Sequence, residues 1–188
     1  LKKHGKTAIV WNESLNSGMM PNDIIVQRWM DKKDRSVEFA NKGGKMIVSE
    51  FYYYYCDYPY GMTSLKKTYS LDPYIKGLTE AGKKNVYGVE CPIWAEYVRD
   101  FDKLSYMCFP RFWAVAEAGW TKRANMDYNS FEERFEALRP MLEEMGIKPA
   151  PRSDWNPNFL QSLKELKQFF KGTTNLDNIL NMIRNNQA

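Results

Sequence analysis

The chain has 188 residues, of which 44% are hydrophobic and 27% charged, and this composition excludes a disordered chain and favours one domain with a short appendage. The formal net charge of +4, from 27 basic and 23 acidic residues, is too small to indicate a nucleic acid or an anionic membrane as partner. No apolar run approaches the roughly 18 residues that span a bilayer, so we expect a soluble protein.

Histidine and cysteine content narrows the possible chemistry. The single histidine, His4, lies in a polar segment, which argues against a histidine-based triad and against a multi-histidine zinc site. The three cysteines, Cys56, Cys91 and Cys108, cannot all pair, and their apolar surroundings are typical of small buried hydrophobic residues.

Four short runs rich in β-branched residues predict strands that are buried on both faces. These runs span 7–12, 23–29, 45–51 and 86–94, and polar residues or glycines bound each of them. Only residues 13–22 separate the first two runs. Because a parallel crossover normally needs about a dozen residues or more, any helix there must be reduced to a turn or be absent.

Helices are expected between and after these strands. A short helix is predicted within 30–44, another near 72–81, and longer ones over 104–119 and 131–145. In the last of these, Ser130 and Glu133 have the spacing of a capping box, and Pro140 predicts a kink.

The C-terminal part of the chain has a different pattern. Residues 148–152 are typical of a linker, and amphipathic helices are expected over 156–172 and 176–184. We therefore divide the chain into residues 1–147 and a linker with a helical tail of unknown role over 148–188.

Alternating strands and helices predict an α/β fold with a parallel sheet. A closed eight-stranded barrel usually needs about 250 residues, and four strands make half of one. We interpret residues 1–147 as the second half, strands five to eight, of a (β/α)8 barrel with reduced crossover helices. The chain begins at Leu1 rather than at a methionine, as expected of a piece of a longer protein.

Aromatic and acidic residues follow the predicted strands. In a barrel the carboxyl ends of the strands converge on the active site, and here they carry Trp11, Trp29, the 55–57 region, and Trp94 with Glu96. Indole rings pack against the apolar face of a pyranose or an N-acetyl methyl group, and carboxylates accept hydrogen bonds from sugar hydroxyls. A single tryptophan is more often a core residue, but the repetition at equivalent positions favours a sugar pocket.

These segments resemble glycoside hydrolase family 20, the β-N-acetylhexosaminidases. GVECPIWAEYV (88–98) and YMCFPRFWAVAEAGWT (106–121) are similar to the family's last strand and following helix. YCDYP (55–59) is similar to its Tyr-Leu-Asp motif, with Cys56 in place of the leucine. The resemblance extends over roughly residues 6–121.

The resemblance implies a (β/α)8 barrel that removes terminal β-linked N-acetylglucosamine (GlcNAc) or N-acetylgalactosamine, without metal or cofactor. The family's reaction is retaining and substrate-assisted, since the sugar's own 2-acetamido oxygen attacks the anomeric carbon. Tyr55 would donate its hydroxyl to that oxygen, while Asp57 and Glu96 would contact sugar hydroxyls. Three indoles would form the wall of the acetamido pocket, namely those of Trp11, Trp29 and Trp94.

Other residues near these motifs are expected to be structural. Glu13 follows the first tryptophan, and Arg111 and Glu117 are expected to form an internal salt bridge or to pack a helix. Trp113 and Trp120 lie on the same predicted helix and are expected to pack there.

The family's Asp-Glu pair, which orients the acetamide and supplies the general acid, does not occur in these 188 residues. We therefore expect the isolated chain to be inactive, with N-acetylhexosamine glycans and the N-terminal half of its own barrel as partners. Exposed sheet edges predict self-association. Two alternatives stay open: a non-catalytic carbohydrate-binding module, and a structural interaction domain that captures a partner through the 156–184 helices.

Overall fold

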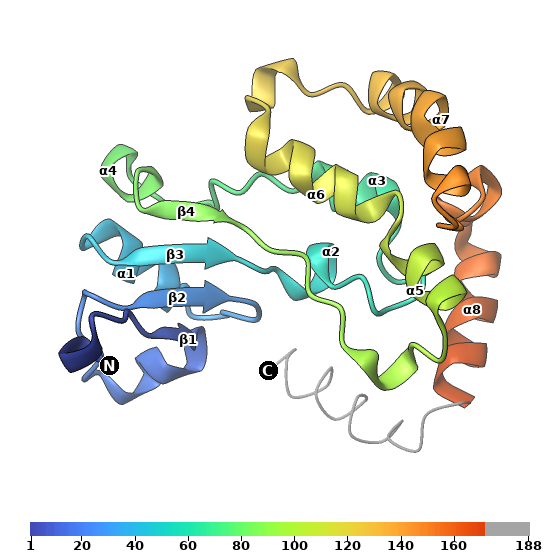
Figure 1. Ribbon diagram of the computed structural model, residues 1–188. Helices are drawn as coiled ribbons and strands as arrows, with labels where there is room; N and C mark the ends of the chain where they lie inside the picture. The colour runs from blue at the N-terminus through green and yellow to red at the C-terminus, as the bar shows by residue number, and fades with distance from the viewer. Residues whose placement is uncertain (172–188) are drawn as a thin grey trace.

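The computed structural model describes residues 1–171 and shows an α/β fold built on a parallel sheet (Figure 1). The sheet has four strands in the order β1-β2-β3-β4, so each strand pairs with the next one in the chain. The strands are β1 (Ile9–Trp11), β2 (Ile25–Arg28), β3 (Lys45–Val48) and β4 (Val86–Val89). The predicted α/β class and parallel sheet are confirmed, and each strand is shorter than its apolar run.

Short helices connect the strands. The β1–β2 connection contains a 3-10 helix, η2 (Asn12–Ser17), as its length predicted, and α1 (Arg35–Asn41) connects β2 to β3. Three short helices follow β3: α2 (Phe51–Tyr54), α3 (Leu65–Ser70) and α4 (Glu80–Lys83). The predicted helix over 72–81 is wrong for most of its length. Ser64 caps α3 and Thr79 caps α4, so the local caps define two separate helices.

The second half of the described chain is helical. It contains α5 (Phe101–Cys108), α6 (Arg111–Trp120), α7 (Tyr128–Glu144) and α8 (Phe159–Lys171). Its 3-10 helices are η3 (Ala95–Tyr97), η4 (Arg123–Asn125) and η5 (Arg152–Asp154), and η1 (Lys2–His4) lies near the N-terminus.

Two helix boundaries differ from the predicted ones. The single helix predicted over 104–119 is divided at Pro110, which has no amide hydrogen to continue α5 and is the N-cap residue of α6. Helix α7 begins earlier than predicted, because the Asp127 side chain accepts from the Ser130 amide at 2.9 Å and caps it. The helix predicted over 176–184 lies outside the described residues.

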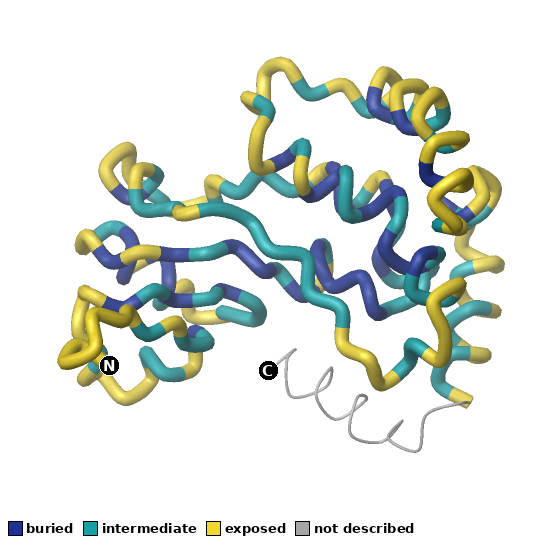
Figure 2. The backbone as a smooth tube through the Cα atoms, viewed as in Figure 1, coloured by how far each residue is buried: buried dark blue, intermediate teal, exposed yellow. Residues whose placement is uncertain are grey.

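The buried core forms around β3 and the helices that cover it (Figure 2). Met46 and Val48 of β3 are fully buried and pack with Ala40 of α1 and Val115 of α6. A larger aromatic cluster joins α3, α6 and α7 to the segment before α8. Within the described residues no helix is long and apolar enough to cross a membrane.

The segment predicted as a linker packs into this aromatic cluster. Ala150 and Trp155 are fully buried, and the Trp155 ring lies 5.5 Å from the Phe135 ring of α7, centroid to centroid. The Ala150 amide donates to the Phe109 carbonyl at 3.0 Å. The division of the chain after residue 147 stays a prediction.

Of the residues on α6 that were expected to have packing or salt-bridge roles, some form these contacts and one is exposed to solvent. Trp113 lies 5.1 Å from the Phe135 ring, and Glu117 forms the expected salt bridge, with Arg134 at 2.8 Å. Trp120 is 93% exposed, so its predicted packing role is wrong within the described chain. It is the last residue of α6, beyond the part of the helix that is covered by α3 and α7.

Candidate functional site

A cavity of about 530 Å³ lies where the strands end. Aromatic rings form most of its wall and three carboxylates complete it: Trp11, Glu13, Trp29, Phe51, Tyr55, Asp57, Tyr58, Trp94 and Glu96. The structure therefore brings all six residues selected from the sequence to one cavity. Phe51 and Tyr58 were not selected, because Tyr55 was the one aromatic residue of this block expected to be functional. Residues 51–54 form a helical turn, in which the alternation of a strand does not apply.

Each connection after a strand contributes to this wall. Trp11 is the last residue of β1, and Trp29 follows the last residue of β2. Tyr55 ends α2, which follows β3, and Trp94 directly precedes η3, which follows β4. The parallel sheet places these four positions at the same edge.

The indole of Trp11 lies between the other two. Its ring centroid is 6.3 Å from that of Trp29 and 6.3 Å from that of Trp94, and Trp29 stacks on Tyr55 at 6.0 Å. Trp94 is 47% exposed, whereas Tyr55 is buried. The cavity thus has a fixed inner wall of rings and an outer indole that solvent reaches.

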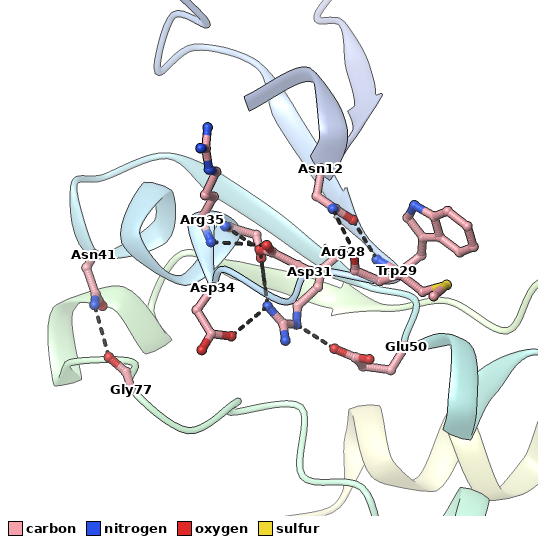
Figure 3. A network of polar contacts seen from close by, with 11 residues as sticks. Asn12, Arg28, Trp29, Asp31, Asp34, Arg35, Asn41, Glu50 and Gly77 are labelled. Atoms are coloured by element: carbon pink, nitrogen blue, oxygen red, sulfur yellow. Dashed lines mark hydrogen bonds and ion pairs between the residues drawn. The ribbon is translucent and has the colours of Figure 1, made fainter. Parts of the chain in front are cut away.

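Trp29 is fixed by a hydrogen bond to Asn12, drawn in Figure 3, and by a second one to Glu13. The buried Asn12 side chain accepts from the Trp29 amide at 3.0 Å and donates to the Met30 carbonyl at 3.4 Å. The indole N–H of Trp29 donates to the Glu13 carboxylate. Glu13 therefore orients a tryptophan of the wall and itself lines the cavity.

An ion-pair network centred on the buried Arg28 lies beside Trp29 (Figure 3). The Arg28 guanidinium contacts Glu50 at 2.5 Å, Asp31 at 3.2 Å and Asp34 at 3.2 Å. Burial raises the pKa of Glu50, and the Arg28 charge opposes that rise. Because Arg28 precedes Trp29 and Glu50 precedes Phe51, this pair holds two segments of the wall together.

Asp57 has an unused hydrogen-bond acceptor. Its side chain is 2% exposed, and its Oδ1 atom is buried with no hydrogen-bond partner among the described residues. Burial is the main cause that raises the pKa of Asp57 to about 6; the nearby Glu96 charge contributes to this rise, and backbone hydrogen bonds and the Arg111 charge oppose it. A buried acceptor without a partner is costly, so it is suited to receive a donor from a ligand.

Tyr55 and Glu96 differ in environment. Burial raises the pKa of the Tyr55 phenol, although a hydrogen bond with Trp94 opposes this effect, so the hydroxyl stays protonated at neutral pH and can donate. Glu96 is exposed at the cavity, where its carboxylate can accept hydrogen bonds from a bound molecule.

Arg111 fixes the loop that carries Asp57 and Tyr58. Its guanidinium is fully buried and donates to the backbone carbonyls of Cys56 at 2.6 Å, Tyr58 at 2.8 Å and Thr63 at 3.2 Å. It also donates to the Met107 carbonyl within α5. Of the two expected roles, an internal salt bridge or the packing of a helix, the structure shows the second. Within residues 1–171 the hydrogen bonds of Arg111 go to carbonyl oxygens and the Met107 sulfur, and they hold the loop against α5 and α6.

Stacked rings with carboxylates beside them, at the carboxyl edge of a parallel sheet, define a class of α/β protein that is typical of sugar binding. Comparison with known proteins gives the family. The sequence profile of the glycosyl hydrolase family 20 catalytic domain matches residues 1–123. The chain belongs to this family, so the resemblance seen in the sequence is confirmed.

Individual relatives agree with the family match. A beta-hexosaminidase of Akkermansia muciniphila is 33% identical over 155 residues, covering 76% of this chain and 31% of its own length. The solved beta-N-acetylhexosaminidase of Streptomyces coelicolor is 30% identical with a TM-score of 0.72, covering 83% of this chain and 34% of its own. A mutant beta-hexosaminidase of Streptomyces plicatus in complex with product GlcNAc is 31% identical with a TM-score of 0.71. This chain spans a third or less of the curated relatives' length.

Proposed function

We propose that this chain forms the sugar pocket of a β-N-acetylhexosaminidase, and that a preceding half of the same barrel supplies the acid. One observation carries the proposal: six residues from four connections meet at one cavity that contains a buried carboxylate oxygen without a partner. The GlcNAc bound to the Streptomyces plicatus relative is a ligand of the size and chemistry that such a cavity accepts.

Each residue then has a role in a substrate-assisted reaction. The indoles of Trp11, Trp29 and Trp94 enclose the acetamido group and hold it beneath the anomeric carbon, which is the near-attack geometry that the step needs. The protonated Tyr55 hydroxyl donates to the acetamido oxygen and keeps it in line. Asp57 and Glu96 accept from sugar hydroxyls, and the unused Asp57 oxygen supports this role.

The chemistry that cleaves the bond is assigned to another part of the enzyme. No Asp-Glu pair occurs in the 188 residues, so the general acid and the carboxylate that orients the acetamide are expected from the first half of the barrel. The open edges of β1 and β4 support this arrangement, since both strands have a partner on one side only. We infer that the four strands correspond to strands five to eight of the barrel.

Two measurements on the chain of residues 1–188 test the proposal. Calorimetric titration with GlcNAc is expected to show binding that is lost in Trp94→Ala and kept in the control Trp120→Ala, whose side chain lies outside the cavity. A folded chain that does not bind GlcNAc, or that binds it equally well in both variants, would contradict the assigned pocket. An aryl N-acetylglucosaminide is expected to remain uncleaved, and turnover by the pure chain would contradict the assignment of the acid to another segment.

A non-catalytic carbohydrate-binding module is the second candidate. It is favoured by the six aromatic rings that this one chain places around the cavity. Production of the chain together with the segment that precedes it in the gene distinguishes the two candidates. Restored hydrolysis supports the enzyme, and binding with no hydrolysis supports the module.

A further inference from the structure

Two cysteines meet directly behind the cavity wall. Cys56 lies between Tyr55 and Asp57, and Cys91 lies in the segment that leads to Trp94. Their Sγ atoms are 2.8 Å apart, with a hydrogen bond between them, although the residues are 35 positions apart in the chain. Both cysteines are free thiols, and neither has a part in the proposed sugar chemistry.

The backbones on either side of the thiols are already joined. The Cys56 amide donates to the Pro92 carbonyl at 3.0 Å, and the Cys91 Sγ atom lies 3.0 Å from the Tyr54 carbonyl oxygen. A disulfide requires its two Cα atoms to be neighbours and its Cβ atoms to face each other. Backbone and side-chain contacts between these two segments provide this arrangement, so a bond needs little movement.

A buried cation lies beside this pair. Arg111 donates to the Cys56 carbonyl at 2.6 Å, and its partners in the described chain are carbonyl oxygens rather than carboxylates. Burial raises the pKa of the Cys56 thiol, but the hydrogen bond from Cys91 and the Arg111 charge outweigh it and lower the value overall. Burial and the neighbouring Cys56 raise the pKa of Cys91. Of the two thiols, Cys56 is therefore the one that loses its proton more easily and acts as the nucleophile.

We propose that Cys56 and Cys91 form a reversible dithiol–disulfide site that a small peroxide oxidises, and that the bond ties the two sides of the cavity together. The deprotonated Cys56 sulfur attacks one peroxide oxygen and the O–O bond breaks, which gives a sulfenic acid on Cys56 and a hydroxide ion. The hydroxide takes the proton of the Cys91 thiol and leaves as water. The second sulfur then attacks the sulfenic sulfur and releases its hydroxyl, which leaves as water after protonation. In total, two thiols and one hydrogen peroxide give one disulfide and two waters.

The burial of the two cysteines favours a small oxidant. Cys56 is fully buried and Cys91 is half-buried, so hydrogen peroxide reaches the pair more easily than a bulky disulfide reagent does. The bond would connect the segment of Tyr55 and Asp57 to the segment of Trp94. This linkage does not depend on what the cavity binds, so it can be tested separately from the proposed function.

Peptide mapping of the folded chain tests the linkage. After reduction, treatment with hydrogen peroxide and alkylation of the remaining thiols, the intact mass is expected to show one disulfide and one alkylated cysteine. The linked peptides are expected to contain Cys56 and Cys91, with Cys108 alkylated. The control Cys108→Ala is expected to form the same bond, and Cys91→Ala to form none. Three alkylated cysteines, or a bond to Cys108, would overturn the proposal.

Thermal unfolding gives a second, independent readout. A bond that closes a loop of this length without distorting the fold is expected to raise the melting temperature of the oxidised chain by about 5 °C or more, and dithiothreitol is expected to reverse the shift. Cys91→Ala is expected to show no shift with peroxide. A linked chain that melts at or below the temperature of the reduced chain would contradict a native geometry suited to the bond.

Discussion

Asp57 and Arg111 are both buried, but they differ in how many of their polar atoms form hydrogen bonds. Asp57 keeps an oxygen without a partner at the cavity, whereas Arg111 uses its guanidinium to bind four backbone carbonyls. The sequence identified Asp57 through its motif and its place after a strand. Its raised pKa could not be predicted, because it depends on burial within the fold and on the charge of Glu96, which comes from a separate segment. The carbonyl partners of Arg111 could not be predicted either, because every residue has a backbone carbonyl and no side-chain pattern indicates which ones it binds.

The titration of Asp57 predicts a pH-dependent stability. Its ordinary pKa of 3.8 rises to about 6 in the fold, so the folded chain holds this proton more tightly than the unfolded chain does. The stabilisation is complete below the unfolded value and is lost as the pH rises through about 6. Asp57→Asn is therefore expected to be more stable than the native chain at pH 7, by about 2–3 kcal/mol. Urea unfolding from pH 4 to 7 measures the difference, which should shrink towards zero at the acid end; a constant difference would contradict it.

Arg111 is expected to be essential to the loop that it binds. Arg111→Met leaves buried carbonyls without donors and should lower the free energy of unfolding by about 3 kcal/mol or more. Arg111→Lys should recover only part of this loss, because an ammonium cannot reproduce the planar set of donors. Urea unfolding measures both variants. Arg134→Lys, at a half-exposed arginine, is the control and should change stability by less than about 1 kcal/mol.

At the scale of helices and strands, the four strands were predictable because each forms a short apolar run with polar ends. Helix boundaries were less predictable, because they depend on single caps such as Asp127 and on the missing amide of Pro110. The segment after α7 packs in a way that its composition does not indicate. Its prolines are typical of a linker, but Ala150 and Trp155 lie in the aromatic core.

Trp155 is expected to be a major stabilising residue of the helical part. Its indole is fully buried and donates to the Ala150 carbonyl at 2.9 Å. Trp155→Ala should therefore destabilise the chain by about 3–5 kcal/mol. Phe159→Ala, at a site 75% exposed on α8, is the control and should be nearly neutral. Chemical unfolding followed by circular dichroism separates the two, and equal effects would mean that the 148–155 segment does not stabilise the core.

At the scale of the whole molecule, the sheet has two edge strands, β1 and β4, and within residues 1–171 each pairs on one side only. Ile9 of β1 is 52% exposed and Tyr87 of β4 is 57% exposed, so apolar side chains accompany free backbone groups at both edges. The sequence predicted these edges, because it contains four strand-like runs and a closed barrel needs eight. The strength of association between the edges of two chains could not be predicted from the sequence, because it depends on which side chains lie exposed along each edge strand.

Such edges predict self-association of the isolated chain. Sedimentation velocity over a range of concentrations is expected to show species larger than the monomer, and Ile9→Lys together with Tyr87→Lys should reduce them. A single monomeric species with a cooperative thermal transition at every concentration would contradict the prediction.

The contact between α8 and the loop at Gly61 restricts how this fold can vary. The Gly61 amide donates to Glu165 at 2.7 Å, and a Cβ atom at this position would lie 2.8 Å from the Cα atom of Ser162. Phe169 of the same helix lies 5.6 Å from the Tyr58 ring, which forms part of the cavity wall. Any side chain at position 61 would force the two backbones apart and draw this phenylalanine away from the wall. The width of one side of the cavity is thus set by the absence of a single methyl group, outside the cavity itself.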